Sequence, residues 1–425
     1  MRRTFVLWHR YAGLTMALFL VIEGLTGSVL AFYEEFDRWL NPQLLTVRVR
    51  NTAPLDPLTL HERAEALDPR AYIKFIELQQ PPGRACSFGV TPKKDPATGK
   101  EYALSYNELL LDPYTGEKLG SRMVGKVSLA RENIPSLILL LHTNLAMPLS
   151  TGRAGPWILG VVAVVWTIDC FVAPYLTLPL RRRSDSRYRS SGPAAAGWWR
   201  RWKPSWLIKT GVGNQRLNYD LHRAAGLWMW PMLFVFAWSG VAFTLPQAYM
   251  PVMKAFFRMS TDETMSMDDT SFAPAKPLEV PALGWREAYA TGQKLMREAS
   301  VQHGFAMQEE KRLFYDPDLG VYGYVIHSSV DLNTWDGTIV LFDGNTGALR
   351  SLSLRAPSAE ARGDVITRWL IWLHMAAVFG RPMQIVVCAM GFGVAVLSAT
   401  GVIVWWLKRK SAHWHRQRVI NARGS

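Results

Sequence analysis

Four long apolar runs constrain what this chain can fold into. They occupy residues 5–32, 155–180, 219–245 and 382–407 of the 425. About 20 mostly apolar residues in a helix cross the hydrocarbon core of a bilayer, so we expect an α-helical membrane protein with four transmembrane helices. The first run follows two arginines, as in a signal peptide. It is longer than a signal-peptide core, and no small-residue cleavage site follows it, so we interpret it as a retained span.

The positive charge of the chain lies mainly beside these runs. The formal net charge is +14, with 48 Lys and Arg against 34 Asp and Glu, which alone would also suit nucleic-acid binding. The basic residues next to the spans are Arg181, Arg182, Arg183, Arg187, Arg189, Arg200, Arg201, Lys203, Lys408, Arg409 and Lys410. Short loops rich in Lys and Arg stay in the cytoplasm. We therefore interpret the charge as a topology signal, with both termini cytoplasmic, the lipid bilayer as the partner and no nucleic acid.

Spans and charge together divide the chain into eight parts. The expected parts are a first transmembrane helix (1–32), a first outer domain (33–134), a short outer-face helix with the second span (135–180), a basic cytoplasmic loop (181–218), a third span (219–245), a second outer domain (246–364), a short outer-face helix with the fourth span (365–407) and a basic cytoplasmic tail (408–425). With 49% hydrophobic and 19% charged residues, the chain has enough polar sequence for two aqueous domains.

Both outer segments have the pattern of a helix followed by strands. The first predicts a helix over 58–67 and strands over 73–78 and 108–111; the second predicts a helix over 285–299 and strands over 322–327 and 338–342. Each also contains an Asp-x-x-Thr-Gly sequence, at 112–116 and 343–347. Asp side chains stabilise tight turns and Gly adopts positive φ. We therefore expect a hairpin turn at both places and an α+β fold for both domains.

The two halves of the chain contain the same motifs in the same order. The motif H-R-x-A-G-L begins at His9 and again at His222, 213 residues later (222 − 9 = 213). The Asp-x-x-Thr-Gly turn recurs after 231 residues (343 − 112 = 231), and the Leu-His pair at His142 recurs at His374 after 232 (374 − 142 = 232). These offsets predict a tandem, parallel repeat, in which each copy has a span, an outer domain, a short amphipathic segment and a second span.

Four histidines in these motifs are the candidate ligands. His9 and His222 lie near the cytoplasmic ends of the first and third spans, and His142 and His374 precede the second and fourth spans at the outer face. A single histidine at a helix end is commonly an interfacial residue or a cap, whereas matched pairs at two levels favour axial ligation of iron by two imidazoles. The sequence predicts two haem groups per chain. The three cysteines form no CxxCH motif, so we expect non-covalent b-type haem.

Arginines accompany each of these histidines. Arg10 and Arg223 directly follow the inner histidines, and Arg153 and Arg381 lie in glycine-containing breaks after the outer ones. Guanidinium binds carboxylates in a bidentate fork, so these arginines are candidate partners of haem propionates. They could equally reach lipid phosphates at the membrane surface. No residue is assigned a catalytic role.

Small, acidic and sulfur-containing residues in the spans leave further alternatives open. Gly13, Gly27, Gly226 and Gly240 could let a flat macrocycle approach the backbone or could serve helix packing. Glu23, in the middle of the first span, could belong to a proton path or to the haem environment. The methionines at 250, 253, 259, 265 and 267 fit an amphipathic interfacial helix better than a soft-metal site.

Taken together, the motifs resemble those of the PepSY-associated transmembrane family. They are W-H-R-x-A-G-L from Trp8, L-H-R-A-A-G-L from Leu221, the two Asp-x-x-Thr-Gly turns and the two Leu-His segments before Gly-Arg breaks, and they cover nearly the whole chain. The resemblance implies a bacterial inner-membrane location and PepSY-like periplasmic domains. Within the family, the chain is similar to ferrisiderophore reductases with two b-type haems. Their haem histidines correspond to His9, His142, His222 and His374.

The resemblance predicts an enzyme, a haem-dependent reductase of ferric siderophores in the periplasm. The chain has no P-loop, no dinucleotide fingerprint opening a helix after a strand, no HExxH and no nucleophile elbow. The electron donor, cytoplasmic or a quinol, is therefore left open. Two alternatives compete with this hypothesis. One is a non-enzymatic membrane scaffold whose outer domains bind a peptide or protein, and the other is a permease for a siderophore or iron.

Overall fold

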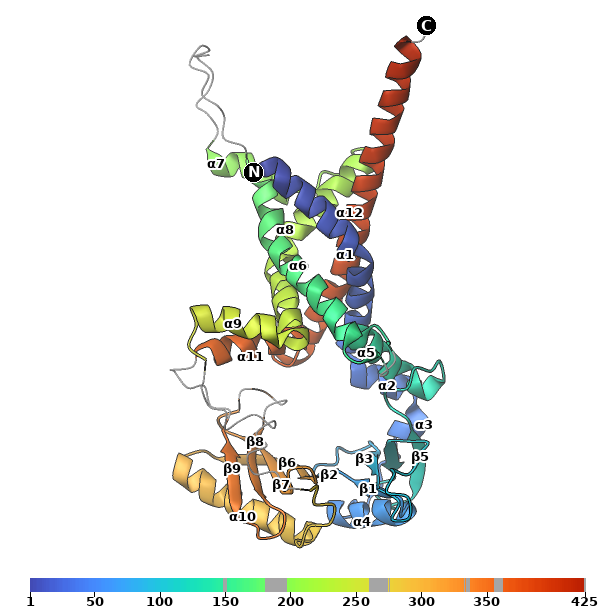
Figure 1. Ribbon diagram of the computed structural model, residues 1–425, viewed down its shortest axis with the longest axis vertical. Helices are drawn as coiled ribbons and strands as arrows, with labels where there is room; N and C mark the ends of the chain where they lie inside the picture. Colours follow the sequence, from blue (N-terminus) through green and yellow to red (C-terminus); the bar gives the residue numbers. More distant parts are fainter. Residues whose placement is uncertain are drawn as a thin grey trace. The chain divides into compact units, whose positions relative to one another are not determined.

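The computed structural model divides the chain into a helical unit and an α+β unit (Figure 1). The structure describes residues 1–147, 151–179, 197–259, 274, 276–331, 333, 337–354 and 362–423, with side chains as far as residue 411. The helical unit comprises Met1–Phe32, Ile138–Phe256 and Ile366–Ser425, and the α+β unit comprises Tyr33–Leu137 and Phe257–Val365. The arginines at 181–189 and the methionines at 265 and 267 lie outside the described residues.

The helical unit is built from the expected apolar runs. Its helices are α1 (Arg2–Leu30), α5 (Ile134–Asn144), α6 (Ala154–Thr177), α7 (Trp198–Trp202), α8 (Asn214–Thr244), α9 (Pro246–Phe256), α11 (Arg362–His374) and α12 (Gly380–Arg423), with a short 3-10 turn η3 (Lys203–Trp206). Within the described residues, α1, α6, α8 and α12 are long and apolar enough to cross a membrane. The expectation of four long apolar helices is therefore confirmed. A helix suits a bilayer because it satisfies its own backbone groups.

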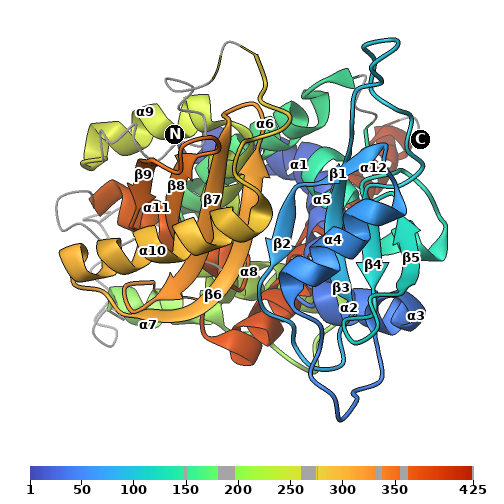
Figure 2. The same cartoon turned by 90° about the horizontal axis from the view of Figure 1, so that it is seen from below.

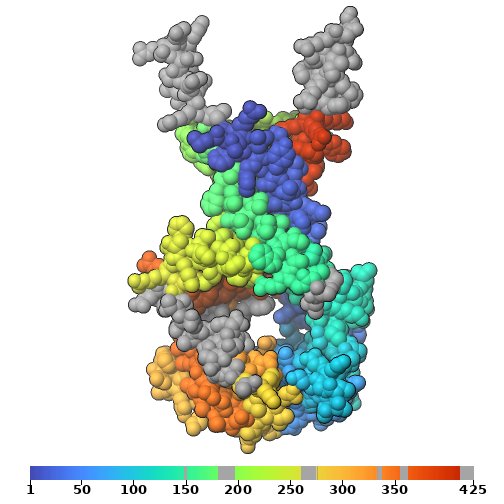
Figure 3. Space-filling model, viewed as in Figure 1, coloured from blue at the N-terminus to red at the C-terminus, as the bar shows by residue number. Residues whose placement is uncertain are grey.

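These four helices pack in a closed order. α1 packs against α6 and α12, and α8 packs against the same two helices, so that α1 and α8 occupy opposite corners of the bundle. Figure 3 shows the first helix, in blue, beside the last one, in red. Their contact is close at two glycines, since a Cβ on Gly24 would lie 2.5 Å from the carbonyl oxygen of Gly391. The Ser28 hydroxyl also donates to the carbonyl of Cys388 at 2.9 Å.

Two antiparallel sheets and their helices form the α+β unit. The strands are β1 (Ala71–Ile73), β2 (Phe75–Glu77), β3 (Cys86–Pro92), β4 (Glu108–Leu111), β5 (Lys118–Arg122), β6 (Met307–Asp316), β7 (Val321–Ser328), β8 (Thr338–Asp343) and β9 (Leu349–Ser353), and the helices are α2 (Tyr33–Leu40), α3 (Pro42–Leu45), α4 (Pro57–Leu67), η1 (Arg131–Asn133) and α10 (Trp285–His303). The sheet orders are β1-β3-β4-β5 and β2-β6-β7-β8-β9. Figure 2 shows α4 over the first sheet and α10 over the second.

The second sheet includes β2 from the first half of the chain, which the sequence did not predict. The run expected as one strand over 73–78 divides at Lys74, so that β1 pairs with β3 while β2 pairs with β6 of the other half. The Lys74 N–H donates to the carbonyl of Gly89 at 3.2 Å, and its own carbonyl accepts from the N–H of Tyr315 at 3.0 Å. The two outer segments therefore form a single compact unit.

The second outer segment also begins later than the sequence division places it. α9, which we had included in the domain at 246–364, belongs to the helical unit. The ring of Tyr249 on α9 lies 4.9 Å from the ring of Trp238 on α8, and its hydroxyl bonds that of Thr367 on α11 at 2.8 Å. Met253 is buried in α9, in agreement with the interpretation of this segment as a packed amphipathic helix.

Both predicted Asp-x-x-Thr-Gly turns are confirmed. One carboxylate oxygen of Asp112 accepts from the N–H of Tyr114 at 2.7 Å, and Gly116 has φ +70°. The carboxylate of Asp343 accepts from the N–H groups of the two residues at 345 and 346, and Gly347 also has φ +70°. Each turn joins two neighbouring strands of its sheet, β4 to β5 and β8 to β9.

A buried ion cluster stabilises the first sheet. The Arg122 guanidinium donates to both oxygens of Asp37, at 2.9 and 2.8 Å, and also to Glu108. Arg122 and Asp37 are only 7% and 5% exposed. Removing one member of a buried ion pair leaves an uncompensated charge, which costs about 3–5 kcal/mol.

We therefore expect Arg122→Met to lower the free energy of unfolding by about 3–5 kcal/mol. Arg286→Met, which removes a solvent-exposed arginine paired with Glu62 at 2.9 Å, is the matched control and should change stability little. The stability of both variants is measured by unfolding the full chain in detergent and monitoring the α+β unit by limited proteolysis. Equal losses in the two variants would contradict the assigned role of the cluster.

A buried histidine makes the stability of the α+β unit depend on pH. His61 of α4 is 1% exposed, and its ring lies 4.3 Å from that of Trp285 on α10. Burial lowers the pKa of His61 from 6.5 to about 4. The folded state thus binds this proton less readily than the unfolded chain does, and the associated stability is complete above pH 6.5 and declines as the pH falls towards 4.

The expected loss over this pH range is roughly 3 kcal/mol, because each pKa unit corresponds to about 1.4 kcal/mol. His61→Leu should remove most of this pH dependence, since leucine has no proton to gain. The measurement is the unfolding temperature of the full chain at several pH values between 7 and 4. His303→Leu, on the last turn of α10, serves as a control and should retain the wild-type slope. An unchanged slope in His61→Leu would refute the assignment.

Candidate functional site

The structure brings the four predicted histidines together in two pairs. His9 of α1 and His222 of α8 have ring centroids 6.1 Å apart, with the ring planes at 47°. His142 of α5 and His374 of α11 have centroids 6.3 Å apart, with the planes at 79°. Each pair takes one histidine from each half of the chain, as the repeat pattern predicts.

The two pairs lie towards opposite ends of the helical unit. Thr26 of α1 contacts His142, and it follows His9 on the same helix by 17 residues (26 − 9 = 17). At about 1.5 Å per residue, this separates the two levels by roughly 25 Å along α1. The separation is close to the thickness of a hydrocarbon core.

In the first pair, each imidazole is held through its Nδ1 atom. His9 Nδ1 lies 3.0 and 2.9 Å from the two carboxylate oxygens of Asp169 on α6. His222 Nδ1 lies 3.0 Å from the carbonyl of Leu397 and 3.2 Å from the hydroxyl of Thr400, both on α12. The Thr400 hydroxyl itself donates to the Leu397 carbonyl, so its oxygen accepts the proton of His222.

The second pair has the same arrangement. His142 Nδ1 lies 2.9 Å from the hydroxyl of Thr26 and 3.1 Å from a carboxylate oxygen of Glu23. His374 Nδ1 lies 2.6 Å from the hydroxyl of Ser239 on α8. Both hydroxyls donate to backbone carbonyls of their own helices, at 2.7 and 2.6 Å. They therefore accept from the imidazoles, and Nδ1 is the protonated nitrogen in both rings.

This pattern leaves Nε2 of all four histidines in the form that binds a metal. A neutral imidazole that donates from Nδ1 has a lone pair on Nε2, and the hydrogen bonds of the described residues use Nε2 in none of the four. Two imidazoles on opposite sides of one metal, at metal–nitrogen distances of about 2 Å, have centroids about 6 Å apart. The observed 6.1 and 6.3 Å agree with this spacing. The residues therefore fit two bis-imidazole iron centres.

Glycines let the histidine rings lie against neighbouring helices. A Cβ on Gly401 would lie 2.9 Å from Cε1 of His222, and a Cβ on Gly27 would lie 3.1 Å from Cε1 of His142. Gly13, one turn after His9, has no atom of the described residues within 4 Å of its Cβ position, so there is open space beside it in this part of the structure. A Cβ on Gly240 would lie 3.3 Å from Ala163, which favours the helix-packing interpretation at that position.

The four arginines differ in their surroundings. Arg223 donates to Asp220 at 2.9 Å and to the carbonyl of Pro204 at 2.7 Å, while its buried Nε has no hydrogen-bond partner among the described residues. Arg10 and Arg153 are exposed, and Arg153 immediately precedes α6. The guanidinium of Arg381 lies 5.9 Å from the centre of the Phe32 ring. Arg223 therefore already has a carboxylate partner within the protein.

The polar partners of the histidines were not all predicted. Glu23 was expected either in a proton path or near haem, and it lies against His142. Asp169, Ser239 and Thr400 were missed. Two signals in the sequence could have found them: Asp169 is an acidic residue inside an apolar run, and Ser239 follows Thr26 at the same offset that separates His222 from His9 (239 − 26 = 213).

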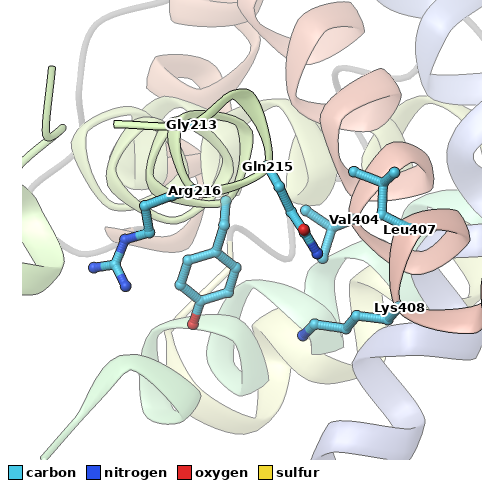
Figure 4. A pocket seen from close by; sticks show the side chains of 7 residues that line it. Gly213, Gln215, Arg216, Val404, Leu407 and Lys408 are labelled. Carbon is cyan, nitrogen blue, oxygen red and sulfur yellow. The ribbon is translucent and has the colours of Figure 1, made fainter. Parts of the chain in front are cut away.

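A cavity of about 460 Å³ lies between the first turns of α8 and the part of α12 at residues 404–408 (Figure 4). It is lined by Gly213, Gln215, Arg216, Tyr219, Val404, Leu407 and Lys408. The Lys408 ammonium lies 5.5 Å from the centre of the Tyr219 ring. Tyr219 precedes His222 on α8 by three residues, and neither His9 nor His222 is among the lining residues.

Comparison with known proteins identifies a family for this chain. A family model described as the PepSY-associated TM region matches residues 6–408. The comparison with curated proteins found no match. Within the described residues, no group of three or more His, Cys, Asp or Glu side chains is arranged to hold a metal ion. The candidate ligands in the helical unit are therefore the two pairs of histidines.

Proposed function

The chain belongs to the PepSY-associated transmembrane family, and from this premise we propose that it is a di-haem membrane oxidoreductase that reduces ferric siderophores. The observation that supports the proposal is the geometry of the two histidine pairs. Both have the centroid spacing of bis-imidazole ligation, and both leave Nε2 available. A bis-histidine b-type haem supplies reversible one-electron transfer between its ferric and ferrous states.

In this proposal His9 and His222 hold one haem, and His142 and His374 hold the other. Their Nδ1 partners fix the tautomer and the ring orientation, which second-shell partners of metal-bound histidines commonly do. The buried Nε of Arg223 and the exposed guanidinium groups of Arg10, Arg153 and Arg381 are the candidate partners of the haem propionates.

The ferric siderophore is the electron acceptor. Siderophores bind iron through hard oxygen ligands, which suit Fe(III) better than Fe(II), so the gain of one electron loosens the chelate. A quinol or another two-electron donor on the cytoplasmic side would reduce two ferric chelates in turn. A quinol would release its two protons and leave as the quinone.

We propose that the protein lies in the bacterial inner membrane with both termini in the cytoplasm. Arg200, Arg201 and Lys203 lie on α7 and η3, and Lys408 and Arg409 lie at the end of the apolar part of α12. Clusters of Lys and Arg beside spans remain in the cytoplasm. This orientation makes His9 and His222 the inner pair, His142 and His374 the outer pair, and the α+β unit periplasmic.

The first test is the haem content of the full-length protein. Purified in detergent after expression with ample haem, the wild type should contain about two b-type haems per chain, measured by pyridine haemochrome and by oxidised and dithionite-reduced spectra. His9→Ala, His222→Ala, His142→Ala and His374→Ala should each lower this to about one. His327→Ala, in β7 and outside both pairs, should keep the wild-type content.

The same protein then allows the reduction itself to be measured. In proteoliposomes with a reductant inside and a ferric hydroxamate outside, a ferrous-specific chelator should report iron reduction that is lost in His142→Ala. A wild type without haem would overturn the mechanism and favour the scaffold, in which the α+β unit binds a protein or peptide. Haem content that does not respond to any of the four histidine substitutions would overturn the assigned ligands.

A second test uses the glycine that contacts His222. Gly401→Val should displace the His222 ring, because even its Cβ would lie 2.9 Å from Cε1, and the haem content should fall towards one per chain. Gly226→Ala is the control, since within the described residues its Cβ would meet the Leu397 side chain alone, at 3.7 Å. It should retain both haems. Gly401→Ala, which adds the same single Cβ as Gly226→Ala, completes the comparison, and equal haem loss in these two variants would argue against a specific position for His222.

A further inference from the structure

Each histidine pair has one carboxylate partner and one uncharged partner. Asp169 contacts His9, and Glu23 contacts His142. In both cases the opposite histidine, His222 or His374, donates to a hydroxyl or a carbonyl instead. The two centres are thus built alike, and in each of them an acidic side chain contacts one of the two histidines but not the other.

Both carboxylates come from the first half of the chain. At the matching offsets the second half has Phe236 (23 + 213 = 236) and Gly401 (169 + 232 = 401). These residues also contact the histidines: the Phe236 ring lies 5.2 Å from that of His374, and the backbone of Gly401 lies against His222. The acidic groups are therefore not a general requirement for holding a histidine in this bundle, because the other two are held without them.

The two carboxylates differ in how strongly they engage their histidine. Asp169 places both oxygens within 3.0 Å of His9 Nδ1, and its side chain is 10% exposed. Glu23 shares the proton of His142 with the Thr26 hydroxyl, which is the nearer partner at 2.9 Å. The other oxygen of Glu23 has no hydrogen-bond partner among the described residues. Asp169 therefore makes the stronger hydrogen bond.

A hydrogen bond from Nδ1–H to a carboxylate makes an imidazole a more basic ligand. A more basic ligand donates more electron density to iron and stabilises Fe(III) over Fe(II), so it lowers the reduction potential. Charge-assisted hydrogen bonds are roughly twice as strong as neutral ones. The carboxylate that binds its histidine more strongly should lower the potential of its centre further.

We propose that Asp169, and to a smaller extent Glu23, are positioning residues that set unequal reduction potentials, with the lower potential at the His9/His222 centre and the higher at the His142/His374 centre. This inference rests on the proposed haem function. Because electrons move towards the higher potential, the inequality favours transfer from the cytoplasmic side to the periplasmic side in the orientation proposed above.

Spectroelectrochemical titration of the full-length protein in detergent tests the proposal without an activity assay. His142→Ala isolates the His9/His222 centre, and His222→Ala isolates the other one. The midpoint potential in His142→Ala should be the lower of the two. Adding Asp169→Asn to His142→Ala should shift it to a more positive value. Glu23→Gln added to His222→Ala should give a smaller positive shift. The control, Thr400→Val in His142→Ala, removes an uncharged partner from the same centre and should shift the potential less than Asp169→Asn does.

The outcomes separate this inference from the function on which it rests. Absence of haem from the wild type would overturn the proposed function. Two haems with the His9/His222 centre at the higher potential, or with a potential that Asp169→Asn leaves unchanged, would overturn the inference alone. If Asp169→Asn loses its haem, the order of the two wild-type centres and the Glu23→Gln shift decide the question.

Discussion

An imidazole placed among apolar helices needs a fixed hydrogen-bond partner for its N–H, and the packing of the helical unit depends on this need. The four Nδ1 hydrogen bonds meet this need, and each also joins two helices. His9 ties α1 to α6, and His222 ties α8 to α12. His142 ties α5 to α1, and His374 ties α11 to α8. The hydrogen bonds that orient the histidines therefore also hold their helices together.

The α+β unit is held together by a different kind of link. Lys74 bonds through its N–H to one sheet and through its carbonyl to the other, so β1 and β2 extend two separate sheets from one short stretch of chain. A sheet edge left unpaired is a liability in water, and β2 covers an edge of the second sheet by pairing with β6. The second sheet takes β2 from the first outer segment, which is why the two segments cluster as one unit.

The sequence predicted features that depend on neighbouring or repeated residues, and it did not predict features that depend on contacts between distant segments. The apolar runs, the Asp-x-x-Thr-Gly turns and the four histidines were found because periodicity, turn chemistry and repeat offsets are local or repeated features. The pairing of β2 with the second sheet and the place of α9 were missed, since both depend on contacts between distant segments. Asp169 was missed for a similar reason, because its meaning depends on His9, which lies 160 residues away.

The repeat and its irregularities have separate consequences for the proposed function. Matched motifs supply two pairs of imidazoles with nearly equal spacing, 6.1 and 6.3 Å, and so account for two sites of the same kind. Two identical sites would give an electron no preferred direction. The direction has to come from positions where the halves differ, and Glu23 and Asp169 are such positions in direct contact with the histidines. The same fold can thus set the number of centres through its symmetry and their order through its departures from symmetry.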